Sequence, residues 1–434
     1  MRSIPVFLIV VLATALLADA QSISDQLRQR TGFELPPGTS AGTATFSLPP
    51  GVGSTTALSI RDAIAIALWN NADLQVDLAS LDVSRADVTE AALFKNLSLS
   101  TLFPVGPKPF EFLLAWPIEE LWQRKQRVKA AQVNLEAVST GLVQNGLNVI
   151  RDVRLAYTDL WLAEARSRIL LESADLRSRI AAFAQRRRDA GDGTGLEVSL
   201  AQADAQSSAE LARITSADVA IARDQLRYLL GMRGTAPAIG ISATQPTSPT
   251  LPELSLLFEL AASNRPDLRA AEVSVQAAAE KAKWERSQVL MMLAPTLSIK
   301  EIGTDGLRAG PGLNMEIPVF SRNQGKISRA DAEVVRTAKR YAALRARVEH
   351  EVADAYNRGL RAQGSLTQIR QQVRPPAEQS IQLSQRAYDN GDVSLLSVLE
   401  ATRQIHDINL REAEASSALQ RALAELERAI GRSL

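Results

Sequence analysis

The sequence repeats itself at a nearly constant offset, and this duplication constrains the fold more strongly than any other feature. The motif RLAY at residues 154–157 has a counterpart, ADAY, at residues 353–356. Five landmark pairs keep an offset of about 200 residues, so each half is expected to form one equivalent structural unit. The other four pairs are Gly191 with Gly391, residues 226–231 with 426–431, residues 70–74 with 264–268, and residues 116–118 with 317–319.

Residues 1–20 have the pattern of a secretory signal peptide. Arg2 supplies a short positive segment, residues 6–17 are apolar, and residues 18–20 (ADA) match a small-residue cleavage site. An uncleaved membrane anchor is the alternative, but the apolar run is shorter than the ~20 residues that a spanning helix needs. We therefore expect the mature protein to act outside the cytoplasm.

The composition argues against several classes of protein. Lys and Arg number 49 against 48 Asp and Glu, so there is no net basic field for nucleic acid. The chain has no cysteine, which excludes disulfides, cysteine-bound metals and a lipidated N-terminal cysteine. His350 and His406 lie far apart and lack ligand spacing, so neither a metal nor any other cofactor is expected.

Hydrophobic periodicity predicts a mainly α fold with a small β part, in which a unit of helix, β-hairpin, long helix and helix occurs twice. From residue 119 to 190 the helical pattern has no proline, which corresponds to a helix of roughly 100 Å. Polar helices of this length need neighbours, as in a coiled coil. The expected segments are the signal peptide (1–20), an extended N-terminal arm (21–56), a first repeat (57–231, strands about 96–118), a linker (232–252), a second repeat (253–431, strands about 295–319) and a tail (432–434).

The first hairpin carries an apolar face. Phe110, Phe112, Leu114 and Trp116 alternate with other residues at the period of a strand, which favours a lipid-facing stripe. Packing against another hairpin in a soluble cap is the alternative. Two hairpins give four strands per chain, too few to close a membrane barrel without an open edge, so several chains are needed.

Several motifs, each weak alone, occur in order in both halves. Together, over residues 57–431, they resemble the TolC-like outer-membrane efflux proteins. The matching segments are Pro117 before Arg124, Lys125 and Arg127, Pro318 before Arg322 and Lys326, residues 388–392 (YDNGD) before residues 398–401 (VLEA), and the leucine-glycine endings at Gly231 and Gly431.

The resemblance implies a homotrimer in which twelve strands form one barrel in outer-membrane lipid and long coiled-coil helices form a periplasmic tunnel. Such a protein performs no bond chemistry. It is the passive exit duct of a tripartite efflux or type I secretion system and docks to a periplasmic adaptor, and through it to an inner-membrane transporter. This sequence departs from the family pattern at Asn71-Ala72, where relatives usually carry Asn-Pro.

The resemblance also places the gate and the adaptor-docking site at the glycine turns. Carboxylates at these tips would form rings around a narrow closed end and favour cations; solvated surface acids are the alternative. The residues assigned to the tips are Gly191, Asp192, Glu197, Gly391, Asp392 and Glu400.

Two alternatives to the duct differ in class. Short hairpins with few lipid-facing positions would also fit a periplasmic helical scaffold or adaptor-like trimer without a transmembrane barrel. An enzyme has little support, because the sequence contains neither a nucleophile motif nor a phosphate-binding loop after a strand. Drugs, metal ions, metabolites and polypeptides all fit the sequence as cargo.

Overall fold

The computed structural model describes residues 23–35, 46–53, 57–103, 110–232, 239–242, 251–288, 293–301, 306–315 and 319–434. The expected signal peptide lies outside these residues. The chain divides into two compact units. The tip unit comprises the described residues up to Gln75, Asn145–Arg265 and Val348–Leu434, and the sheet unit comprises Val76–Gln144 and Pro266–Arg347.

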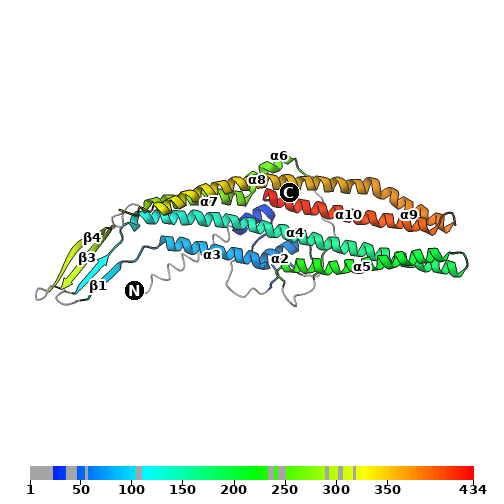
Figure 1. Cartoon of the computed structure of the whole chain (residues 1–434), viewed down its shortest axis with the longest axis horizontal. Helices are drawn as coiled ribbons and strands as arrows, with labels where there is room; N and C mark the ends of the chain where they lie inside the picture. The colour runs from blue at the N-terminus through cyan, green and yellow to red at the C-terminus, as the bar shows by residue number, and fades with distance from the viewer. Residues whose placement is uncertain are drawn as a thin grey trace. The chain divides into compact units, whose positions relative to one another are not determined.

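Figure 1 shows the elements in chain order. They are α2 (Ile60–Asn70), α3 (Ala72–Ala92), β1 (Ser98–Leu102), β2 (Glu111–Ala115), α4 (Glu120–Asp189), α5 (Gly195–Leu229), α6 (Leu254–Asn264), α7 (Pro266–Ser287), β3 (Leu293–Glu301), β4 (Leu307–Met315), α8 (Gln324–Gln368), the π-helix η2 (Ile369–Val373), α9 (Arg374–Asp389) and α10 (Leu395–Ile430).

Residues 23–31 form a further helix, whereas the sequence suggested an extended arm there. The helix forms because its apolar side is covered: Ile23 and Leu27 are almost fully buried. Leu27 packs where α4 carries Gly146, which has no Cβ to fill the space. The glycine is therefore the feature that admits this helix.

The sheet unit contains one antiparallel sheet with strand order β1-β2-β3-β4. The second hairpin has nine-residue strands, as a spanning strand requires, but β1 and β2 have only five residues each in the described part. The first hairpin is therefore shorter than the sequence pattern indicated. Strand β2 pairs with β1 on one side and β3 on the other, so the two hairpins form a continuous sheet whose edges are β1 and β4.

The basic stretch after Pro117 has a structural role in the sheet unit. Arg124 donates to the carbonyl of Ala92 at 2.7 Å, and Arg127 donates to the carbonyl of Ala91 at 3.0 Å. These guanidinium groups satisfy the carbonyls at the end of α3, which lack helical partners. Burial raises the pKa of Glu120, but its ion pairs with Arg127 and Lys95 outweigh that effect and hold the pKa below its ordinary value.

In the tip unit, helices α4 and α8–α9 each turn back at a glycine into the following helix. Gly191 and Gly391 both have positive φ, 88° and 82°, and their amide N–H groups donate to the carbonyls of Arg188 and Tyr388. The next N–H in each turn donates to the carbonyl five residues before it, which completes a Schellman motif. Gly231 and Gly431 end α5 and α10 in the same way, so all four helix ends follow one rule.

In each repeat, one side chain at the break between the first two helices binds a carbonyl at the end of the last helix. Asn71, between α2 and α3, donates from Nδ2 to the carbonyl of Leu229 at 3.1 Å. Arg265, between α6 and α7, donates from Nη1 to the carbonyl of Ala429 at 3.4 Å. Two different residues thus make an equivalent hydrogen bond at the position where the sequence departs from the family pattern.

The segment that joins the repeats is held by a tyrosine. The N–H of Leu58 donates to the carbonyl of Gly240, and the N–H of Ser242 donates to the carbonyl of Leu58, both at 2.9 Å. The hydroxyl of Tyr157 on α4 donates to the same Leu58 carbonyl at 3.0 Å. Tyr157, in the repeated RLAY motif, thereby attaches the linker to α4.

The chain passes Pro375-Pro376 through a π-helical turn rather than a break. The N–H of Arg374 donates to the carbonyl of Ile369, five residues earlier. Prolines at the first positions of α9 need no N–H partner there, so the wider turn lets the helix continue through them.

Candidate functional site

The first part of the site is the sheet, which has two chemically distinct faces. Cross-strand partners share a face, and alternate rows of partners therefore form each side. The row Leu99, Leu114, Leu297 and Pro311 lies on the same side as the row Thr101, Phe112, Ile299 and Ala309. This side is apolar across the strands, and it contains two of the four residues assigned to the lipid-facing stripe.

The other two stripe residues continue the alternation beyond the ends of β2. The rings of Phe110 and Phe112 lie with their centroids 4.8 Å apart. The N–H of Trp116 donates to the carbonyl of Pro295 at 3.2 Å, which extends the ladder by one position. Leu114 and Trp116 are 37% and 45% exposed, so this face is uncovered in the single chain.

The opposite face of the sheet is small and polar. It carries Ser98, Ser100, Thr296 and Ser298, with glycines on β4. The charged residues are paired across strands: Lys300 Nζ lies 3.1 Å from a carboxylate oxygen of Glu111. A sheet with one apolar and one polar face is typical of strands that separate lipid from water.

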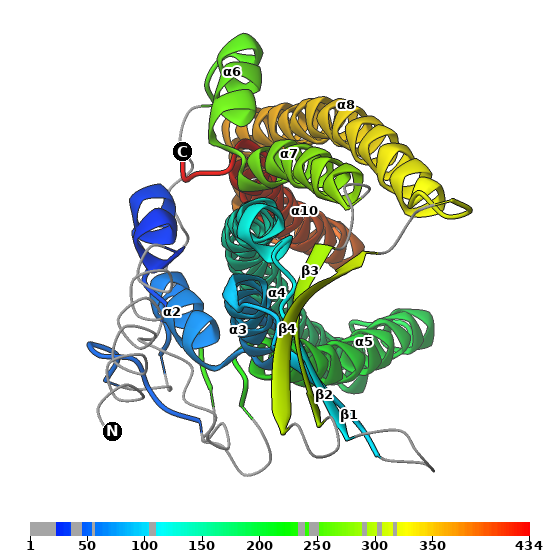
Figure 2. The ribbon, with the colours of Figure 1, turned by 90° about the vertical axis from the view of Figure 1, so that its left-hand side faces the viewer.

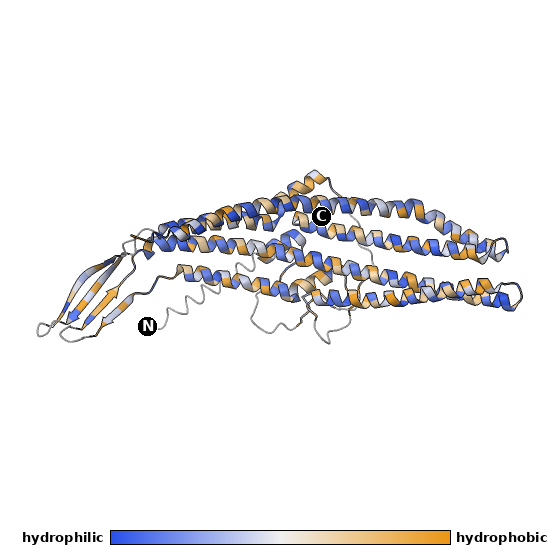
Figure 3. Cartoon of the chain, in the orientation of Figure 1, coloured by the Kyte–Doolittle hydropathy of each residue, from blue (hydrophilic) through white to orange (hydrophobic). Residues whose placement is uncertain are grey.

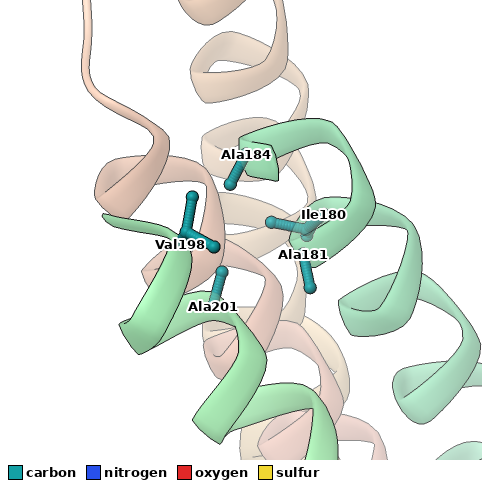
Figure 4. Close-up of a cluster of buried hydrophobic side chains, with 5 residues drawn as sticks. All are labelled: Ile180, Ala181, Ala184, Val198 and Ala201. Carbon is teal, nitrogen blue, oxygen red and sulfur yellow. The ribbon is translucent and has the colours of Figure 1, made fainter. Parts of the chain in front are cut away.

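The second part of the site is the pair of helical tips in the tip unit. A cluster of small apolar side chains, drawn in Figure 4, fills the space between α4 and α5 just behind the first turn. Tyr388 on α9 and Leu399 on α10 pack against this cluster, and the rings of Phe183 and Tyr388 meet edge to face at 5.8 Å. The helix pair α4–α5 and the helix pair α9–α10 are thus joined near their glycine turns. The cluster comprises Ile180, Ala181, Ala184, Val198 and Ala201.

The tip residues assigned from the sequence fall into different environments. Asp192, Asp392 and Glu400 are exposed. Glu197 instead caps α5: its carboxylate accepts from the N–H of Thr194 at 3.2 Å, and its own N–H donates to the Thr194 hydroxyl at 3.2 Å. Glu197 and Glu400 are therefore not equivalent in the two repeats.

A buried carboxylate that the sequence did not indicate joins three helices behind the tips. Asp204 on α5 is 9% exposed and pairs with Arg177 on α4 at 3.3 Å and with Arg403 on α10. Burial, and then the positive charge of Arg177, lower the pKa of nearby His406. No sequence signal marks this junction, because its members come together only through packing.

Helices α4 and α10 lie side by side, seen nearly end-on in Figure 2, and a series of ion pairs connects them. Such pairs hold two polar helices in register, although each exposed pair contributes little alone. The pairs are Arg151 with Glu425, Arg154 with Glu427, Asp159 with Arg421, and Arg166 with Glu414.

Sites of two other kinds are absent from the described residues. None of the helices there combines the length and the apolar character that crossing a bilayer requires, and Figure 3 shows polar residues along every helix. In the same part of the chain, no three His, Cys, Asp or Glu side chains are grouped as a metal site would need.

Comparison with known proteins gives consistent matches over most of the chain. Residues 257–432, most of the second repeat, match the family model described as outer membrane efflux protein. The cobalt-zinc-cadmium resistance protein CzcC of Cupriavidus metallidurans is 27% identical, over 86% of this chain and 90% of that protein. Nodulation protein T of Rhizobium leguminosarum bv. trifolii is 24% identical, over 83% of each. The solved structure of CusC has a TM-score of 0.72 at 21% identity, covering 90% of this chain and 96% of that one.

A duplicated unit with long paired helices, glycine-turned tips and a two-faced open sheet defines a protomer of a membrane conduit. Residues 257–432 carry an outer membrane efflux protein domain, and the TolC-like fold expected from the sequence is confirmed. It is an outer-membrane efflux channel whose helical part lies in the periplasm, and not an enzyme. The solved channels that this chain resembles are trimers that work with adaptor proteins.

Proposed function

We propose that three copies of this chain close a single duct for efflux, with the sheets forming a twelve-stranded barrel and the helices a tunnel. The observation that carries the proposal is the open sheet. Among the described residues, β1 and β4 each pair on one side only, and an open edge cannot be left in lipid. Pairing β4 of one copy with β1 of the next removes every edge.

The helices support the same assembly. Helix α5 carries a row of exposed apolar side chains on the side away from its packed face, which includes Ala201, Ala212 and Leu226. A row of exposed apolar side chains along one side of a helix marks a contact surface. The row is Leu196, Leu200, Leu211, Ile214 and Ile221, between 47% and 69% exposed.

Replacing Ile221 with glutamate is expected to dissociate the trimer. Ile221 is 69% exposed in the single chain, so the substitution does not disturb its fold. In the assembly it would bury an unpaired carboxylate, which costs several kcal/mol and weakens association at least about tenfold. Light scattering of the detergent-solubilised protein measures the change. Leu171→Glu, an exposed position on α4, is the matched control and should leave the trimer intact.

We propose further that the tips close the duct and receive the adaptor. Asp192 and Asp392 lie at the turns, exposed, next to glycines that allow the tight reversal. The Asp204 junction and the cluster behind the tips hold the α4–α5 and α9–α10 helix pairs of one copy together. A gate of this kind is a two-state element, closed by contacts between helices and opened when the adaptor separates the tips.

A single cysteine tests the gate, since the chain has none of its own. In Asp392→Cys and Asp192→Cys, oxidation is expected to cross-link copies at the closed tips and to remove most of the single-channel conductance, which reductant restores. Asp175→Cys, on the shaft of α4, should neither cross-link nor block. If neither tip variant cross-links in the closed protein, the tips do not meet and the gate is placed wrongly.

The scaffold alternative makes a different prediction for the sheet. A scaffold would be released from cells by osmotic shock, whereas a barrel stays with the outer-membrane fraction. The apolar face built on Phe112 and Leu114 supports lipid contact, because a soluble cap would cover it within the chain. We therefore assign Phe110, Phe112, Leu114 and Trp116 to the lipid side.

A further inference from the structure

A groove in the tip unit, separate from the tips, is rich in arginine. It lies between α4, α8 and α10 and has a volume of about 660 Å³. Small residues, including the buried Ala362, Ala415 and Ala422, line it together with charged side chains. Four arginines oppose two glutamates in the lining. These are Arg358, Arg361, Arg411, Arg421, Glu414 and Glu425.

The carboxylates of the groove are already engaged, but two of its arginines are not. Arg361 and Arg411 are exposed, and neither has a carboxylate partner among the residues described. The positive excess therefore belongs to these two side chains. The paired groups are Arg421 with Asp159 at 2.5 Å, Arg358 with Asp354 at 2.9 Å, Glu414 with Arg166 at 2.6 Å, and Glu425 with Arg428 at 3.5 Å and with Arg151 at 3.9 Å.

The side chains of α4 indicate whether the groove lies on the inner or the outer surface of the proposed tube. Leu155 lines the groove, and Asp159, one turn on, pairs with Arg421 there. Tyr157 lies about 200° around the helix from Leu155 and points to the opposite side, where it binds Leu58 in the segment that lies over α4. In a closed tube the three copies of this segment must lie on the outer surface, because inside the tube they would fill the bore. The groove therefore faces the bore.

We propose that this groove is an anion-binding site on the export path, and that the duct favours cargo bearing carboxylate or phosphate groups. The inference rests on the proposed trimeric duct. Guanidinium groups bind such anions through paired N–H donors. Three copies repeat the site around the axis, and a passage lined by one sign of charge raises the local concentration of the opposite ion.

Two free arginines per copy suit transit rather than retention. An exposed groove binds its anion in contact with water, where each charge-assisted contact is weak and salt-sensitive. Weak sites repeated along or around a pore let an ion enter and leave, as conduction requires. The groove thus acts as a selective passage.

Reversal potentials in planar bilayers test the proposal with the full-length protein in a potassium chloride gradient. Arg361→Gln with Arg411→Gln is expected to lower the chloride-to-potassium permeability ratio at least about twofold relative to the wild type. Millimolar inorganic phosphate should reduce the conductance of the wild type and have a smaller effect on the double variant.

Two control proteins separate charge from position. Arg361→Lys with Arg411→Lys keeps both charges and should keep the permeability ratio, while weakening the phosphate effect because lysine lacks the guanidinium fork. Arg179→Gln with Arg213→Gln removes the same charge from exposed helix surfaces outside the groove and should change neither. Channels whose ratio and phosphate response are unaltered in the Gln double variant overturn the anion site alone. Absence of any channel activity in the wild type overturns the proposed duct itself.

Discussion

Replacing Gly231 with alanine is expected to cost about 3 kcal/mol or more of the free energy of unfolding, since two penalties combine. Gly231 ends α5 with φ of 69°, a conformation that costs an L-residue about 1 kcal/mol or more. In addition, a Cβ there would lie 2.2 Å from the carbonyl oxygen of Asn70. Backbone occupies that space, so no side-chain movement can relieve the contact. Urea unfolding followed by circular dichroism measures the loss.

The other glycines at helix ends provide matched controls for this experiment. Gly191 has φ of 88° and also closes a Schellman motif, but a Cβ there would meet no atom within 4 Å. Gly191→Ala should therefore cost only the conformational penalty of about 1 kcal/mol. Gly431→Ala should fall between the two, because its nearest atom, the carbonyl oxygen of Asn264, is 2.9 Å away. Equal losses at Gly231 and Gly191 would show that close approach to the helix break does not matter.

Local signals such as these glycines explain why the sequence predicted so much of this fold. Residues that act locally leave local signals: Gly191 and Gly391 at the turns, and the alternation of Phe110, Phe112 and Leu114 in the first hairpin. Duplication at one offset then assigned the same elements to the second half. Period and turn chemistry together were sufficient for the class of fold.

Features that depend on tertiary contact left no such signal. Asp204 is one acid among many on a charged helix, and only packing brings Arg177 and Arg403 to it. The helix at residues 23–31 exists because its apolar side meets α4. Equivalent positions also diverged, since residue 397, the counterpart of the capping residue Glu197, is a serine. The constant offset between the repeats could not show which acidic residues cap a helix and which are exposed to solvent.

Arg265→Met is expected to destabilise the tip unit by about 3 kcal/mol. Arg265 is 3% exposed and lies 2.6 Å from the carboxylate of Glu351, which also pairs with Arg428 at 3.0 Å. Methionine fills much of the same volume, so the loss reports the missing guanidinium rather than a cavity. Both Glu351 and the carbonyl of Ala429 lose a donor in a site that water reaches poorly. Arg213→Met, which breaks a fully exposed pair with Glu210, should have no measurable effect.

The first repeat supplies the variant that separates the two lost interactions. Asn71 stands at the position equivalent to Arg265 and binds the carbonyl of Leu229 with its amide. If the repeats are equivalent in backbone geometry, asparagine at position 265 can reach the carbonyl of Ala429 in the same way. Arg265→Asn should then recover about 1 kcal/mol relative to Arg265→Met, the value of one hydrogen bond, while the ion pair with Glu351 stays lost. No difference between the two variants would mean that the helix break in the second repeat depends on charge alone, and that the duplicated halves keep their shape through different chemistry.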